Sequence, residues 1–331
     1  MGKRIIEVDI AKGLGMLMVV FGHLNMYGMG LDGITSFIFI FHVPLFFFLS
    51  GLFYRKKDTI EKTVVSKLKG LYLPFFLANL TFLIVDVIRF DTHINIIDFL
   101  SGRQIAPLVD ALWFVICLVY ASVLYKIVDR IFNSRLIPVS IVAVILFIVG
   151  YKIPQLTILC QTLVAFFLYH LGRLVSEFDG IQKWIKIPIK VQLPVFAISG
   201  CAIWILSRAN SVNMASGQYG MPLLFILGVL SGIMFTFSFS CIAVRIHKMG
   251  IVFEYVGKRT MWIIIFHMVI IQALFLFHEL IIPHIGKYDP PMWFWYILIF
   301  LLSSFTPCVM RDVWNYLKSI FGKRFIIWQQ R

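Results

Sequence analysis

Residues 220–245 read GMPLLFILGVLSGIMFTFSFSCIAVR and contain no charged side chain before Arg245. Roughly 20 apolar residues in an α-helix cross a bilayer core about 30 Å thick, because each residue adds 1.5 Å of rise. This stretch is therefore predicted to be a transmembrane helix. Nine further stretches of similar character lie near residues 9–29, 33–54, 69–90, 109–128, 135–151, 156–175, 192–208, 258–281 and 291–311.

The composition of the whole chain agrees with a membrane protein. Of its 331 residues 60% are hydrophobic and 14% are charged, and the mean hydropathy is +0.91. A soluble domain averages about 45–50% apolar and about 25% charged residues. Backbone groups in lipid must pair within their own segment, so continuous apolar runs of this length predict helices. We expect an all-α polytopic helix bundle with about ten transmembrane helices; nine or eleven stay open, because 135–151 and 192–208 are the weakest runs.

The basic residues are distributed unevenly between alternate loops. If the amino terminus is cytoplasmic, the outer loops hold only five of the lysines and arginines. These five are Arg89, Arg103, Lys152, Arg208 and Lys287. The asymmetry follows the positive-inside rule and predicts cytoplasmic termini in a multi-pass protein of the inner or plasma membrane. It also accounts for the net charge of +14 without a nucleic-acid partner.

The polar stretches between the apolar runs are short. None is long enough to fold separately, so we expect one membrane domain over residues 1–331. The outer stretch 208–220, rich in Asn, Ser and Gly, is predicted to be a plain loop. The five cysteines all fall within predicted spans without a spacing typical of a metal site, so neither a metal nor a permanently bound cofactor is expected.

The first predicted helix carries ionisable side chains that lipid does not favour. Residues 9–23 read DIAKGLGMLMVVFGH. At 100° per residue, Lys12 and His23 share one face and lie about 16 Å apart along the axis. Asp9 precedes Lys12 by three residues and is placed to neutralise it. We interpret this face as turned toward an interior cavity, and the three glycines of the stretch as sites of close approach by another helix.

Two more histidines are expected at a similar depth in the membrane. Residues 41–51 read FHVPLFFFLSG, in which Pro44 should kink the helix near His42. Residues 261–267 read MWIIIFH and end at His267. From the predicted interfaces, His23, His42 and His267 lie roughly 21, 16 and 13 Å from the cytoplasmic boundary. Three helices therefore bring a histidine into one central layer.

Each of these side chains also has an ordinary structural interpretation. A lone histidine in a membrane helix most often bonds a neighbouring carbonyl, which is the preferred interpretation for His170 and His278 near span ends. Lys12 alone is long enough to reach the inner interface. His42 and His267 admit both interpretations. The phase relation between Lys12 and His23 favours a functional site over either alternative.

These segments, in this order, resemble the acyltransferase-3 family of integral membrane O-acyltransferases, and more narrowly its fucose 4-O-acetylase-like polysaccharide branch. The resemblance covers essentially the whole chain. Its most specific parts are 9–23, 41–51, 71–76, 111–118 and 257–267. The family hallmark is a basic residue and a histidine separated by ten residues on the first helix, here Lys12 and His23. Much of the family has arginine where this chain has Lys12, which keeps the charge but not the bidentate guanidinium fork.

The resemblance implies a ten-helix bundle that takes an acyl group, usually acetyl, from cytoplasmic acyl-CoA. The acceptor is a hydroxyl of a cell-surface polysaccharide or its lipid-linked precursor. The expected catalytic residues are Lys12, His23, His42 and His267. The cations expected to attract the CoA donor are Lys12, Lys56, Lys57, Lys258 and Arg259. Structural support is expected from Asp9, Pro44, Ser50, Gly51 and Trp113, of which Trp113 is by default an interfacial aromatic anchor.

A sugar hydroxyl is a poor nucleophile at neutral pH, so its attack on the thioester needs a base. We assign this role to His23, because an imidazole titrates near neutrality. The oxyanion that develops on the thioester needs a hydrogen-bond donor, for which His42 and His267 are candidates; either of them is also placed to relay the proton. In an alternative route His23 is acylated first and passes the acyl group outward.

The main rival is a carrier that exports a glycan or small solute and uses the intramembrane histidines and Lys12 as a proton path. The absence of a convincing internal repeat argues against it, since many transporters are built from repeated halves. A membrane scaffold without chemistry leaves three histidines at one depth unexplained. The sequence does not separate acetyl from succinyl as the acyl group.

Overall fold

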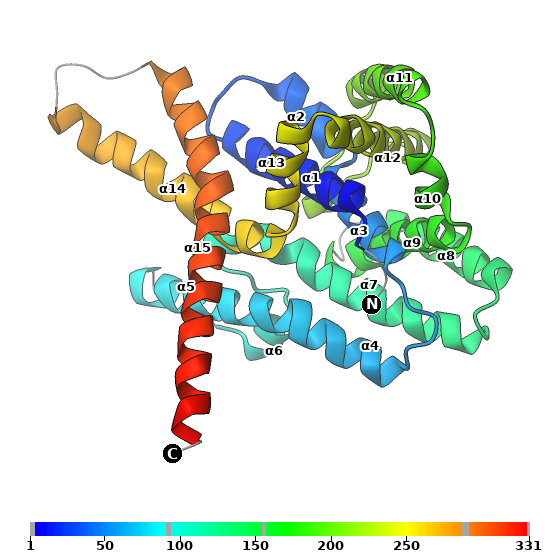
Figure 1. Ribbon diagram of the computed structural model, residues 1–331, viewed down its shortest axis with the longest axis horizontal. Coiled ribbons are helices and arrows are strands. Elements are labelled where there is room, and N and C mark those ends of the chain that lie inside the picture. The colour runs from blue at the N-terminus through cyan, green and yellow to red at the C-terminus, as the bar shows by residue number, and fades with distance from the viewer. Residues whose placement is uncertain (1–3, 91–93, 154–156, 286–290, 330–331) are drawn as a thin grey trace.

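The computed structural model describes residues 4–90, 94–153, 157–285 and 291–329 (Figure 1). Within these ranges the regular structure is helical, apart from one β-bridge between Asn213 and Gln218. The elements are α1 (Ile6–Asn25), α2 (Asp32–Phe39), α3 (His42–Leu52), α4 (Ile60–Lys67), the π-helical turn η1 (Leu68–Tyr72), α5 (Leu73–Phe90), α6 (Ile96–Leu100), the 3₁₀ turn η2 (Pro107–Leu112), α7 (Trp113–Ile131), α8 (Leu136–Lys152), α9 (Thr157–Glu177), α10 (Gly180–Ile185), α11 (Ile189–Ala209), the 3₁₀ turn η3 (Met214–Ser216), α12 (Pro222–Arg245), α13 (His247–Gly257), α14 (Thr260–Ile285) and α15 (Met292–Gln329).

The predicted fold class, an all-α polytopic bundle, is confirmed. Eight segments of the described chain are long and apolar enough to cross a membrane, namely Asp32–Leu52, Ile60–Ile88, Pro107–Ile131, Ile158–Glu177, Ile189–Ala209, Pro222–Arg245, Thr260–Leu280 and Met292–Ile320. Two of the ten predicted spans fall outside this set. The apolar helix α8 has only 17 residues, and the 20-residue α1 carries Glu7, Asp9 and Lys12.

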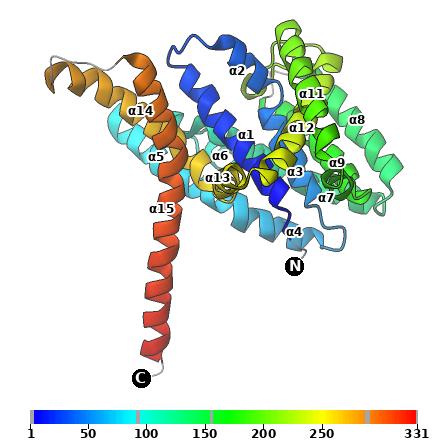
Figure 2. The same ribbon diagram turned by 45° about the horizontal axis from the view of Figure 1, so that its top comes forward.

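Two helices extend beyond their predicted ends. The predicted span 69–90 continues back through η1 into α4, which begins at Ile60. Thr59 caps α4 by accepting a hydrogen bond from the Lys62 backbone N–H at 3.2 Å. This helix start lies in a charged stretch outside the predicted span. The predicted span 291–311 runs on to Gln329 in α15, which projects beyond the rest of the bundle (Figures 1 and 2).

The predicted kink near His42 is a complete break between α2 and α3. Phe41, between the two helices, has φ −141° and ψ −16°, outside the helical range. Pro44 lies in the first turn of α3, where its missing N–H costs no helical hydrogen bond. The proline therefore sets where α3 begins, and with it the position of His42 at the first residue of that helix.

Helix α1 is enclosed by α3, α12, α13 and α14, so its polar residues face protein instead of lipid. The closest crossing is with α13. A Cβ atom on Gly13 would lie 2.0 Å from the Phe253 carbonyl oxygen, and one on Gly257 would lie 1.8 Å from the Asp9 carbonyl oxygen. The expectation that glycines of the first helix permit close approach is confirmed, and the crossing holds α13 at a fixed place along α1.

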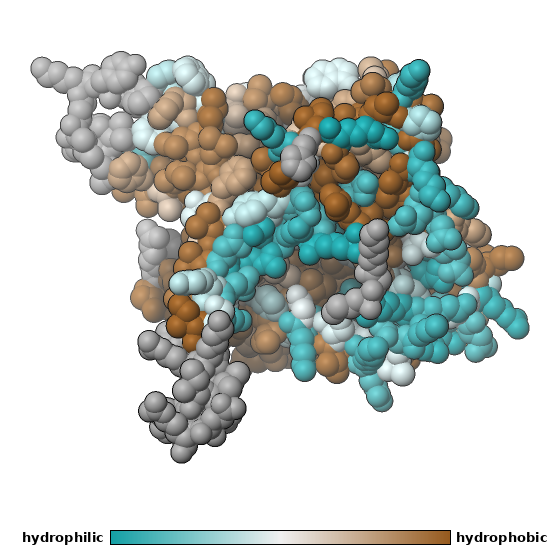
Figure 3. Space-filling model, in the orientation of Figure 1, coloured by the Kyte–Doolittle hydropathy of each residue, from teal (hydrophilic) through white to brown (hydrophobic). Residues whose placement is uncertain are grey.

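The surface shows where polar residues gather. In Figure 3 hydrophilic residues collect around the amino-terminal end of the chain and over α4 and α10, whereas apolar residues cover the flank formed by α14 and the adjoining part of α15. α4 and α10 belong to the stretches that the charge pattern assigned to the inner side. The apolar flank has the composition expected of a lipid-facing surface.

Candidate active site

One stripe of α1 faces two cavities in the interior of the bundle. Lys12 and Met16 line the first, which we call the lysine cavity, with a volume of about 300 Å³. Val19 and His23 line the second, the histidine cavity, of about 150 Å³. The spacing of these four residues, four, three and four, is that of a single helical face. Lys12 and His23 therefore share one face that looks inward.

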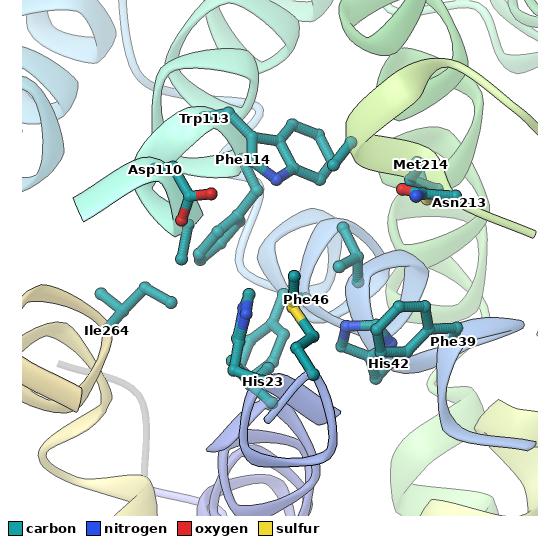
Figure 4. A pocket seen from close by; sticks show the side chains of 15 residues that line it. His23, Phe39, His42, Phe46, Asp110, Trp113, Phe114, Asn213, Met214 and Ile264 are labelled. Carbon is teal, nitrogen blue, oxygen red and sulfur yellow. The ribbon is translucent and has the colours of Figure 1, made fainter. Parts of the chain in front are cut away.

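The histidine cavity brings together the three histidines of the predicted central layer. His23 and His42 both line it, from α1 and α3 (Figure 4). His267 of α14 lies directly behind His23, with the two ring centroids 5.1 Å apart. His267 is fully buried and His42 is 8% exposed, so both rings are shielded from bulk water.

Hydrogen bonds to the backbone fix the tautomers of His42 and His267. The Nδ1 atom of His42 lies 3.0 Å from the Ile38 carbonyl oxygen, and that of His267 lies 2.8 Å from the Ile263 carbonyl oxygen. A carbonyl oxygen only accepts, so each Nδ1 carries the hydrogen. In the neutral ring Nε2 is then an acceptor. From the sequence, these two histidines are candidate donors to the oxyanion. Either ring can donate from Nε2 only in its cationic form, with a hydrogen on both nitrogens.

Two of the ring nitrogens are buried and have no hydrogen-bond partner among the described residues: Nδ1 of His23 and Nε2 of His267. They belong to the pair of rings whose centroids are 5.1 Å apart. A buried polar atom without a partner costs free energy, so two of them in adjacent rings call for a physical explanation, of which a catalytic role is one. His267 Nε2 is a lone-pair acceptor, so it is suited to an N–H donated by His23.

The remaining polar wall comes from residues that the sequence did not single out as functional. Asp110, in η2, lies close enough to His23 to act on it electrostatically. Asn213 comes from the stretch 208–220, which was predicted to be a plain loop. Beyond the end of α11 this stretch is a loop that contains the short turn η3 and one β-bridge, and it also supplies Met214 and Ala215 to the cavity. Gln161 anchors it by donating to the Met214 and Ala215 carbonyl oxygens at 2.9 and 2.7 Å.

Trp113, expected as an interfacial anchor, is part of the same wall. Figure 4 shows its indole nitrogen on the side of the ring that faces the cavity. The indole N–H only donates. Trp113 thus supplies the histidine cavity with a hydrogen-bond donor that does not depend on pH.

The lysine cavity is lined by Lys12, Ser50, Lys67 and Thr260 among polar residues. The Lys12 ammonium lies 3.7 Å from an Asp9 carboxylate oxygen, as predicted, and 4.6 Å from the centre of the Phe53 ring. Asp9 also pairs with Arg4, so its charge is shared between two cations. Lys67, which the sequence treated only as a topological charge, has no ion-pair partner within the described part of the chain.

A family model described as an acyltransferase domain matches residues 5–310. The chain belongs to the acyltransferase-3 family. No curated protein and no solved structure gives a significant match. Because it belongs to this family, the protein is a membrane acyltransferase. This conclusion replaces the interpretation of the chain as a carrier. The two cavities lie entirely within the matched residues.

Four of the cations expected to attract the donor of this acyltransferase lie outside both cavities. Lys56 and Lys57 are exposed in the loop between α3 and α4 and line neither cavity. Lys258 is paired with Glu254. Arg259 makes a two-pronged ion pair with Asp312 of α15, in which Nε donates to Oδ1 at 2.9 Å and Nη2 donates to Oδ2 at 2.8 Å, and its guanidinium lies over the Tyr255 ring. The cations on the cavity wall are Lys12 and Lys67 instead.

Arg259 is expected to stabilise the acyltransferase without binding the donor. Arg259→Gln removes the ion pair that joins the start of α14 to α15. Because Asp312 is 42% exposed, the loss in the free energy of unfolding should be about 1 kcal/mol, or a few degrees in Tm. The KM for acyl-CoA should stay within about twofold of the wild-type value. A tenfold rise in the KM for acyl-CoA at unchanged Tm would instead show that Arg259 binds the donor.

Three of the residues expected to support the site, Pro44, Ser50 and Gly51, lie in α3. Gly51 of α3 faces Gly172 of α9, and a Cβ atom at either position would lie 1.9 Å from a carbonyl oxygen of the other helix. Ser50, the residue before it, lies on a neighbouring face of α3 and lines the lysine cavity. Pro44 fixes the start of α3, as described above. The motif FHVPLFFFLSG therefore positions His42 at one end and a close helix crossing at the other.

Proposed function

We propose that this acyltransferase moves an acetyl group, or another short acyl group, from acyl-CoA to a hydroxyl of a cell-surface polysaccharide or its lipid-linked precursor. This places it in the fucose 4-O-acetylase-like branch of the family. The observation that carries the proposal is the stripe of α1 that presents an ammonium to one cavity and an imidazole to the next. A cation suits the anionic donor, and an imidazole suits proton removal from a hydroxyl.

The donor occupies the lysine cavity in this proposal. Lys12 and Lys67 attract the phosphates of CoA, and Lys67 is the stronger candidate because no carboxylate neutralises it in the described chain. The wall of this cavity includes Lys67 of α4 and Gly70 and Leu71 of η1, at the end of α5 that the positive-inside pattern assigns to the cytoplasm. Cytoplasmic acyl-CoA therefore has a route to the interior without crossing the membrane. The protein is then an inner or plasma membrane enzyme with cytoplasmic termini.

The acceptor enters the histidine cavity from the opposite side, past the segments that carry Asp110 and Asn213. Carboxylate and amide groups are typical partners of sugar hydroxyls, because they accept and donate hydrogen bonds in fixed directions. Both segments belong to stretches assigned to the outer side. A glycan chain thus reaches His23 with one hydroxyl while the rest remains outside the bundle.

Transfer is proposed to occur directly from the thioester to the acceptor, without acylation of His23. Nε2 of His23 takes the hydroxyl proton as the oxygen attacks the thioester carbonyl carbon, and a tetrahedral oxyanion forms. The oxyanion then collapses, the carbon–sulfur bond breaks, and the His23 imidazolium returns its proton to the CoA thiolate. The Trp113 indole N–H and the Asn213 amide are the proposed oxyanion donors, because neutral His42 and His267 present only acceptors at Nε2.

His267 acts as a positioning residue for His23. Its own N–H is held by the Ile263 carbonyl oxygen, which leaves Nε2 as an acceptor. In the part of the chain that the structure describes, neither this Nε2 nor the Nδ1 of His23 has a partner, and in the proposed reacting complex the Nδ1–H of His23 donates to it. That bond leaves the lone pair of His23 on Nε2, toward the substrate, as a base requires. The arrangement follows the general logic of a base oriented by a second group.

The experiment that tests the proposal offers radiolabelled acetyl-CoA to inverted membrane vesicles from native cells that carry or lack the protein. Label should appear in glycan only in vesicles with the protein; uptake of label into the lumen without transfer overturns the proposal. Covalent label on the protein that hydroxylamine releases would indicate the route through acylated His23 instead.

Lys67→Met is expected to raise the KM for acetyl-CoA about tenfold at nearly unchanged kcat, since a charge contact of about 1.4 kcal/mol is worth a factor of ten. Lys69→Met, two residues along on η1 and outside the wall of both cavities, is the matched control. Equal KM values for the two variants would remove Lys67 from the donor site.

A further inference from the structure

The two cavities share part of their walls. Phe46 of α3, Phe114 of α7 and Ile264 of α14 line both of them. Lys12 lines only the lysine cavity, and His23 lines only the histidine cavity. The three shared side chains therefore stand between the cation and the imidazole, at the level where the stripe of α1 passes from Met16 to Val19.

The partition is apolar and well supported. The rings of Phe46 and Phe114 lie with their centroids 5.9 Å apart, and Phe114 makes a second, edge-on contact with Phe47 at 6.4 Å. Phe46 is 9% exposed and Ile264 is 2% exposed. None of the three carries a polar atom in its side chain, so water and hydrated groups gain no hydrogen bond there. Figure 4 shows Phe46, Phe114 and Ile264 around the ring of His23.

We propose that Phe46, Phe114 and Ile264 form a constriction that selects the acyl group by size and keeps water from the thioester. This inference rests on the proposed function, because it assumes that the thioester moves from the lysine cavity toward His23. The acyl end is the least polar part of the donor, so it can pass between aromatic and aliphatic side chains that the phosphates and amides cannot. A methyl group needs little displacement of the rings, whereas each added methylene must be accommodated among packed side chains.

The same constriction separates transfer from hydrolysis. Water that reached the thioester beside His23 would be activated by the same base and would release free acid. An apolar closure between the cavities excludes that water until the acceptor hydroxyl occupies the histidine cavity. Enlarging the constriction should therefore have two linked effects: tolerance of longer acyl groups and release of CoA without an acceptor.

The test compares acetyl-, butyryl- and hexanoyl-CoA as donors in inverted vesicles whose own glycans serve as acceptor. Phe46→Ala and Phe114→Ala are each expected to raise the ratio of hexanoyl to acetyl transfer at least about tenfold, in line with the 10–200-fold effect of single methylenes in apolar pockets. Both should raise CoA release in detergent without acceptor. Phe48→Ala is the matched control, because Phe48 lies on the same helix, packs on Phe237 and lines neither cavity.

Ile264→Phe gives a second, opposite measurement that does not depend on a large-to-small change. It narrows the constriction, so acetyl transfer should fall while the KM for acetyl-CoA stays near the wild-type value. The folded Phe46→Ala and Phe114→Ala proteins could show normal acetyl transfer and an unchanged ratio of hexanoyl to acetyl transfer. That result would overturn the proposed constriction and leave the proposed function standing. Absence of transfer from every acyl-CoA by the wild type overturns the proposed function, and the constriction with it.

Discussion

His23→Ala is expected to lower acyl transfer by a factor of about 10²–10⁴, the range by which a positioned general base accelerates a reaction. The substitution removes an imidazole that lines the histidine cavity. Among the described residues it is also the histidine whose ring lies against a second histidine, His267. His267 cannot take over, because it lies behind His23 and lines neither cavity. The measurement is labelled acetyl transfer to glycan in inverted vesicles.

The control for this prediction is the binding of donor. His23 lies outside the lysine cavity, so His23→Ala should keep the wild-type affinity for acetyl-CoA and the wild-type elution profile in detergent. His267→Gln should lower kcat less than His23→Ala does, because it removes only the group that orients the base. Wild-type transfer by His23→Ala would exclude His23 as the base and leave the family assignment intact.

Gly257→Val is expected to prevent the protein from folding correctly. A side chain at this position meets the Asp9 backbone carbonyl at 1.8 Å, and backbone cannot move aside by changing a rotamer. Overpacking of a core typically costs about 1–3 kcal/mol, and a clash with backbone belongs at the upper end. The separation of α1 from α13 would also shift α14, which follows directly and carries Ile264 and His267. Loss of the monodisperse peak in detergent is the readout.

The matched control for this substitution is Gly200→Ala in α11. Its Cβ atom would lie 3.4 Å from the Phe235 ring, an ordinary van der Waals distance. Gly200→Ala should therefore express, elute and transfer acetyl like the wild type, and replacing a helical glycine by alanine favours the helix slightly. Equal behaviour of the Gly257 and Gly200 variants would contradict the close crossing of α1 and α13.

Local patterns in the sequence were sufficient for the features that depend on a single helix. The lengths of the apolar runs predicted the class of the fold, and Pro44 predicted a kink near His42, where the structure has a break between α2 and α3. The in-phase relation of Lys12 and His23 required only the helical repeat. His170 was interpreted as a structural histidine, and the structure gives it hydrogen bonds to the Tyr125 and Ser140 hydroxyls at 2.9 and 2.8 Å.

The second cation of the lysine cavity, Lys67, could not be predicted in the same way as Lys12. Lys258 and Arg259 stand out in the sequence beside the motif that ends at His267, but Arg259 is neutralised by Asp312, 53 residues further along. Lys67 looked like one topological charge among many, yet it lines the lysine cavity. Which cation is free depends on the partners that folding brings near it, and no local pattern records them.

By itself the sequence determined that the chain is a helical membrane protein, that one face of its first helix carries Lys12 and His23, and that three histidines share a depth. These follow from hydrophobic length and helical periodicity, which are properties of neighbouring residues. Only the tertiary structure decided that His267 stands behind His23, that η2 and the stretch 208–220 contribute to the wall of the histidine cavity, and that Phe46, Phe114 and Ile264 line both this cavity and the lysine cavity. The physical reason is that a cavity wall is assembled from several helices, and their relative rotation is set by packing contacts between residues far apart in the chain.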